Sequence, residues 1–179
     1  GVPRGLIGTS VPFRYNHFEE LERINDSTPG GLAAIVIEPV RDHDPAPGFL
    51  ESVRELATKT GAVLIVDEVS SGFRLNTGGA HLLKGMEPDI AVFAKAMGNG
   101  YPIGAIIGRC DVMQAAQDTF ISSTYWTERL GPAAALATIE KYKKYDVSQH
   151  LVETGRRVQD IWRRAASKAG IEIDVGGIA

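Results

Sequence analysis

The sequence has little of several features that would point to particular classes of protein. Cys110 is its single cysteine, so no disulfide can form within the chain. Lysine and arginine form no basic block and the net charge is -3, which argues against nucleic acid as a partner. No apolar run approaches the roughly 18 residues that a membrane span needs. The N-terminus has neither the charged start nor the apolar core of a signal peptide. These absences favour a cytoplasmic protein that binds neither nucleic acid nor membrane.

Metal chemistry also has little support in the sequence. The four histidines are scattered, and their spacing is not typical of a metal site. They are His17, His43, His81 and His150. We therefore expect no bound metal.

Short apolar runs alternate with helical patterns along the chain. Apolar runs predict strands over 32–40, 62–68, 89–95 and 104–108, and the first has no polar alternation, which predicts burial on both faces. Helices are predicted over 18–25, 49–61, 131–145 and 147–170, followed by the start of a strand at 171–175. Strands that alternate with helices favour an α/β fold with a mostly parallel sheet.

Three ionisable residues follow the predicted strands directly. Glu38, Asp67 and Lys95 each stand at a carboxyl end, which is where ligands bind in open parallel sheets. A charge at such a position is costly unless it has a partner. Two interpretations remain open here. Asp67 and Lys95 form a structural ion pair, or Lys95 forms a Schiff base with an aldehyde cofactor while Asp67 holds the pyridine nitrogen of pyridoxal phosphate.

Two segments carry a resemblance to a known family. "VLIVDEVSSGFR" (63–74) and "PDIAVFAKAMGNGYPIGAIIG" (88–108) resemble the core of the class III aminotransferases, which belong to fold type I of the pyridoxal-phosphate enzymes. Within that family, the segments resemble the glutamate-1-semialdehyde aminomutase-like members most. The interval from Asp67 to Lys95, 95 − 67 = 28, fits the family, as does the upstream "AAIVIEPV" strand.

The resemblance implies a role for each matching residue. Lys95 would carry the Schiff base and move the proton between substrate and cofactor, while Asp67 would pair with the pyridine nitrogen. Val69 would pack against the ring, although an ordinary core valine explains it nearly as well. Ser70 would lie near the phenolic oxygen. Thr127, five residues before Pro132, would bind the phosphate of the neighbouring subunit's cofactor.

Alternatives remain open for two of these positions. Thr124 is a rival for the phosphate role, and Thr127 would alternatively cap the helix that starts near Arg129. Glu68 is expected to be structural, hydrogen-bonded near the start of its loop.

The same resemblance implies an architecture and an activity. The fold would be a three-layer αβα arrangement, with 1–145 forming part of the large cofactor-binding domain. Residues 146–179 would lead towards a C-terminal small domain outside this fragment. The activity would be amino-group transfer between an amine or amino acid and a carbonyl acceptor, in a homodimer with its site at the interface. Alternatives are the intramolecular transfer of an aminomutase, or a non-catalytic module with an Asp67–Lys95 ion pair.

Overall fold

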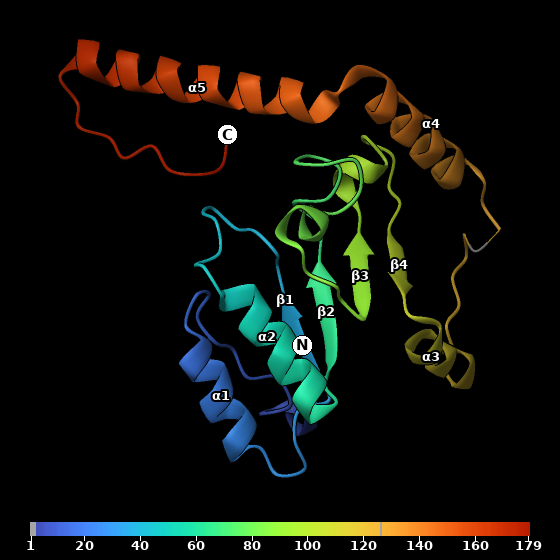
Figure 1. Cartoon of the computed structure of the whole chain (residues 1–179). Coiled ribbons are helices and arrows are strands. Elements are labelled where there is room, and N and C mark those ends of the chain that lie inside the picture. The colour runs from blue at the N-terminus through green and yellow to red at the C-terminus, as the bar shows by residue number, and fades with distance from the viewer. Residues whose placement is uncertain (1–2, 126) are drawn as a thin grey trace.

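A four-stranded sheet organises the chain, in the spatial order β1-β2-β3-β4 (Figure 1). In the computed structural model, which describes residues 3–125 and 127–179, β2 is parallel to both β1 and β3, and β4 is antiparallel to β3. The mostly parallel sheet predicted from the sequence is therefore confirmed. The strands are β1 (Ala34–Ile37), β2 (Val63–Asp67), β3 (Ile90–Phe93) and β4 (Ala105–Gly108).

The predicted helices are also present. In α2, apolar residues recur on one face, and Gly61 ends the helix in a left-handed conformation at φ 78°, which a side chain would disfavour. The α-helices are α1 (Phe18–Ser27), α2 (Phe49–Thr60), α3 (Cys110–Met113), α4 (Leu130–Tyr145) and α5 (Val147–Ala169); short 3-10 turns are η1 (Arg4–Leu6), η2 (Ala80–Lys84), η3 (Lys95–Met97) and η4 (Gln114–Asp118).

One face of the sheet forms the main core. The helices α1 and α2 lie over β1 and β2 (Figure 1), and their apolar residues pack with Ile35, Ile37, Leu64 and Val66. On the opposite face Val36 is 59% exposed. The prediction that the first strand is buried on both faces is therefore wrong for this chain, because no helix of the described residues covers Val36.

A second, smaller core joins α4 to the end of β3. Phe73, Phe93 and Met97 pack with Ala135 and Tyr142 of α4. The Phe73 ring meets the Phe93 ring edge-on at 5.6 Å and the Tyr142 ring at 6.1 Å between centroids. These contacts hold α4 against the segment that follows β3.

The last part of the chain leaves the sheet. The long helix α5 extends away from it (Figure 1) and has no buried residue. Residues 171–179 form no strand, so the strand predicted there is not present. Among the described residues, no helix combines the length and apolar character needed to cross a membrane.

Candidate active site

The carboxyl ends of three parallel strands bring the predicted site residues to one edge of the sheet. Asp67 ends β2 in register with Val92 of β3, and Lys95 lies two residues beyond the end of β3. Lys95 has a φ of 45°, a left-handed conformation that is uncommon for a residue with a side chain. Strained backbone of this kind is concentrated at functional sites.

The Lys95 amine is held by a hydroxyl group. Its Nζ donates a hydrogen bond to Ser70 Oγ at 2.8 Å. Asp67 and Lys95 both lie within the described part of the chain, and no ion pair joins them. The interpretation of these residues as a structural ion pair is therefore wrong, and the amine stays exposed at the surface of the site.

The Asp67 carboxylate is oriented by its own loop. Asp67 Oδ1 accepts a hydrogen bond from the backbone N–H of Val69 at 2.8 Å, an Asx-type turn. Its second oxygen accepts no hydrogen bond from the described residues. The carboxylate borders a cavity of about 210 Å³ that Phe13, Tyr15 and Arg41 also line. Asp67 therefore lines a space beside the sheet and has one oxygen that accepts no hydrogen bond from the described residues.

Lys95 borders a different and larger cavity. This cavity of about 830 Å³ lies along the glycine-rich turn after Lys95 and is also lined by Arg74, Tyr101 and Tyr142. Within that turn, a side chain on Gly98 would place Cβ 2.2 Å from the carbonyl oxygen of Tyr101. The close approach of backbone to backbone therefore requires glycine at position 98.

Glu68 lies below these residues with no exposed surface. Its Oε1 accepts a hydrogen bond from the backbone N–H of His81 at 2.8 Å and lies 2.7 Å from His81 Nδ1, while Oε2 accepts one from Ser71 Oγ at 2.7 Å. Burial opposes ionisation of Glu68, but the hydrogen bonds from His81 and Ser71 outweigh it and hold the pKa of Glu68 below its usual value. The expected structural role of Glu68 is confirmed.

The partner of Glu68 was not found from the sequence. No sequence pattern distinguished His81 from the other histidines. Gly79, two residues before it, does relate to this contact. A side chain on Gly79 would place Cβ 2.2 Å from His81 Nδ1 and 2.8 Å from Glu68 Oε1. The contact between Glu68 and His81 therefore leaves no room for a side chain at position 79.

Comparison with known proteins identifies the family. The family described as Aminotransferase class-III matches residues 13–175. The chain belongs to the class III aminotransferases. It is 35% identical over 184 residues to a 3-aminobutyryl-CoA aminotransferase of Cloacimonas acidaminovorans, covering 99% of this chain and 44% of that protein. It is 36% identical over 186 residues to a glutamate-1-semialdehyde 2,1-aminomutase of Syntrophobacter fumaroxidans, covering 100% of this chain and 43% of that protein.

Solved structures show the same fold. The FumI protein of Sphingopyxis sp. MTA144, in a PLP internal aldimine form, superposes with a TM-score of 0.84 at 26% identity over 92% of this chain and 41% of that one. A transaminase with PLP bound also gives a TM-score of 0.84, at 28% identity over 98% of this chain and 43% of that one. The fold-type-I α/β class is confirmed, and this class III aminotransferase chain spans less than half the length of these relatives.

Four of the five predicted site residues of this class III aminotransferase chain lie together. Asp67, Val69 and Ser70 share one turn, and Lys95 reaches it through the Ser70 hydroxyl. No hydrogen bond joins Thr127, a described and exposed residue just before α4, to any of these four.

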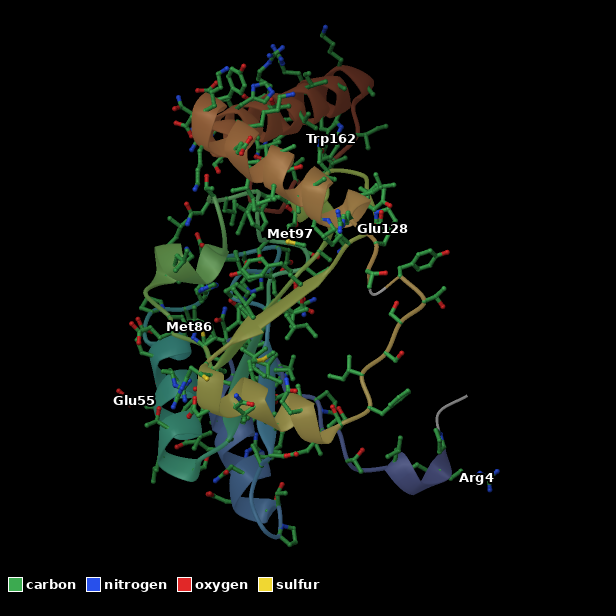
Figure 2. All side chains as sticks on the ribbon, turned by 90° about the vertical axis from the view of Figure 1, so that its right-hand side faces the viewer. Arg4, Glu55, Met86, Met97, Glu128 and Trp162 are labelled. Carbon is green, nitrogen blue, oxygen red and sulfur yellow. The ribbon has the colours of Figure 1, made fainter. Side chains whose placement is uncertain are left out.

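Glu128 lies at the start of α4 (Figure 2). Its carboxylate accepts hydrogen bonds from the backbone N–H groups of Leu130 and Gly131. Burial and the nearby Glu128 charge together raise the pKa of Tyr101. The alternative in which Thr127 caps this helix is therefore wrong, because Glu128 does so.

Proposed function

We propose that this chain carries the lysine and aspartate of a pyridoxal-phosphate site and takes part in amino-group transfer between an amine or amino acid and a carbonyl acceptor. One observation carries the proposal. Lys95 and Asp67 stand at the carboxyl ends of adjacent parallel strands without neutralising each other, and each is oriented by a different group of the same turn. An ion pair between them would have neutralised both charges and left neither side chain available to a cofactor.

The donor set fits this cofactor. Asp67 has one uncommitted oxygen for a protonated pyridine nitrogen, and Lys95 has an exposed primary amine for covalent attachment. When bound, pyridoxal phosphate supplies an electron sink that allows a proton to leave the substrate α-carbon.

This chain's own residues would then act as follows. Asp67 keeps the proton on the pyridine nitrogen, and the Val69 amide holds the Asp67 carboxylate in place. Ser70 orients the Lys95 amine, which holds the cofactor and later moves a proton at the substrate α-carbon. Val69, half-buried beside Asp67, would pack against the ring face.

The remaining parts of the proposal rest on the family. Thr127 would bind the cofactor phosphate of a neighbouring subunit, with Thr124 as its rival, in a homodimer of cytoplasmic location. Residues 1–145 would belong to the large domain and 146–179 would lead out of it. Intramolecular amino transfer is a second candidate, because glutamate-1-semialdehyde aminomutases are among the similar proteins.

Covalent loading tests the proposal. The purified chain is mixed with pyridoxal phosphate, its absorbance recorded, and the mixture reduced with borohydride and mapped by peptide mass spectrometry. We expect the reduced adduct on Lys95 and its loss in Lys95→Ala, with Lys84 as an internal control because its amine is engaged by Asp44 at 2.6 Å. If the adduct is spread over many lysines, or is absent from Lys95 in a chain extended at both ends as well, the proposal fails.

A further inference from the structure

The turn after β2 has two kinds of residue. The side chains of Asp67, Val69 and Ser70 are half-buried or exposed at the candidate site. Between and after them, Glu68 and Ser71 are buried. The turn therefore has one group of side chains at the site, which are Asp67, Val69 and Ser70. A second group, Glu68 and Ser71, is directed into the protein, and we call it the lower row.

The lower row is fixed by several hydrogen bonds. The Glu68 backbone N–H donates to the Val92 carbonyl at 2.8 Å, and the Glu68 carbonyl accepts from Gly72 at 2.9 Å. The Glu68 side chain holds Ser71 through Oε2 and His81 through Oε1. Glu68 is thus tied to the neighbouring strand, to its own turn and to η2.

His81 provides the far end of this network. An ionised carboxylate offers only acceptors, so the contact of 2.7 Å requires a hydrogen on His81 Nδ1. The His81 ring lies beside Phe93 at 6.5 Å between centroids, on the strand that leads to Lys95. The network therefore extends beneath both segments that carry the candidate site residues.

We propose that Glu68 and His81 are positioning residues that set the directions of the Asp67 carboxylate and the Ser70 hydroxyl, and through Ser70 that of the Lys95 amine. The role of these two residues in catalysis rests on the proposed function. Their effect on the conformation of the turn does not depend on it. Because Val69 and Ser70 lie between Glu68 and Ser71, fixing both ends of this four-residue stretch fixes the two residues inside it.

Graded variants separate the parts of the network. Glu68→Gln keeps an oxygen for His81 and gains an N–H that can donate to Ser71 Oγ, so it preserves the hydrogen bonds without the charge. Glu68→Ala leaves the donors of His81 and Ser71 buried without partners. If Glu68→Ala does not fold, the pair His81→Asn and His81→Ala carries the test, because only Asn retains a side-chain N–H close to the Nδ1 position.

Asp89 offers a matched control. It is also a buried carboxylate, 5% exposed, and it accepts hydrogen bonds from the Leu64 backbone N–H and from Arg54 and Arg109. It stands just before β3, at the opposite end of the sheet from Asp67. Asp89→Ala therefore imposes a similar loss of buried hydrogen bonds away from the turn.

Amide hydrogen exchange of Val69 is the first readout, because that N–H is the one bound to Asp67 and no cofactor is needed. We expect protection to fall about tenfold or more in Glu68→Ala, about threefold or less in Glu68→Gln, and not to change in Asp89→Ala. Equal loss in Glu68→Ala and Asp89→Ala, at matched global stability, would overturn the inference.

Selective reaction of Lys95 is the second readout. The yield of borohydride-reduced pyridoxyl adduct on Lys95, relative to the exposed Lys59 in the last turn of α2 in the same sample, is expected to fall about tenfold in Glu68→Ala and to be rescued in Glu68→Gln. A merely structural role would lower stability without changing this ratio, and an unchanged ratio therefore refutes positioning. If the unmodified chain forms no Lys95 adduct even when extended at both ends, the proposed function fails, while the exchange of Val69 still decides the geometric inference.

Discussion

The glycine-rich turn after Lys95 gives a sharp test of how tightly the site is built. Gly98 has φ -89° and ψ -11°, which alanine adopts easily, so Gly98→Ala introduces no backbone strain of its own. Its Cβ would nevertheless lie 2.2 Å from the Tyr101 carbonyl oxygen and 2.7 Å from Ile103 Cγ2. The turn would have to open, because the carbonyl belongs to the backbone and cannot rotate away.

Gly104 provides the matched control at the other end of the same turn. Its Cβ would lie 3.4 Å from the Phe93 carbonyl oxygen, an ordinary contact. Both substitutions restrict the unfolded chain equally, which favours folding by about 0.4–1 kcal/mol. Forcing a methyl group into a filled space costs about 1–3 kcal/mol. We therefore expect Gly98→Ala to be less stable than Gly104→Ala by about 2 kcal/mol.

The assay is urea unfolding followed by circular dichroism, with thermal unfolding in parallel. For a chain of this length, about 2 kcal/mol corresponds to a melting temperature about 4–8 °C lower. The pyridoxyl adduct on Lys95 should decrease in Gly98→Ala alone, because opening the turn moves the Lys95 backbone. Equal unfolding midpoints for the two variants would refute the reasoning.

Three further predictions concern single residues. Lys95→Gly should be more stable than Lys95→Ala by about 1 kcal/mol in urea unfolding, since only glycine relieves the left-handed backbone at φ 45°; equal stability would mean that the backbone is not strained there. Glu128→Ala should cost about 0.5–2 kcal/mol and Glu128→Asp less, because two backbone N–H groups of α4 lose their acceptor; hydrogen exchange confined to the first turn of α4 would report the loss. The lowered pKa of Glu68 means that its ionised form stabilises the fold above the ordinary carboxyl pKa of about 4.3 and that this contribution is lost as the pH falls through the folded pKa. Urea midpoints measured from about pH 6 to pH 3 should therefore fall less steeply in Glu68→Gln than in the unmodified chain, and identical slopes would contradict the assignment.

The parts of the fold that follow from local patterns were predictable. Apolar runs ending in Asp67 and just before Lys95 indicated neighbouring strands, and parallel pairing then brought both residues to one edge. Gly61 indicated the end of α2. The antiparallel direction of β4 could also be predicted from the sequence. The connection over residues 94–104 is too short for the crossover helix that a parallel strand would need.

Other features depend on contacts that the chain makes only when folded. The exposure of Val36 depends on which helices cover the sheet, and an apolar run does not report that. The pairing of Glu68 with His81 depends on the path of the loop between them, and the capping of α4 by Glu128 depends on the local turn before Leu130. In each case the residue type was compatible with several partners, and packing selected one.

Adjacent placement of Asp67 and Lys95 on parallel strands has a consequence for how the sequence between them can vary in length. Asp67 lies opposite Val92 on the paired strand, about 4.8 Å away, and Lys95 follows Val92 by three residues, so their relative position is set by strand pairing and not by the length of the connection. The segment between the two strands is held at His81, whose backbone N–H donates a hydrogen bond to Glu68. The residues after it, Leu82, Leu83 and Gly85, are exposed. Doubling the length of a flexible loop costs only about 0.6 kcal/mol. Insertions should therefore be tolerated at Gly85, the exposed residue that follows η2, while the geometry at Lys95 is retained.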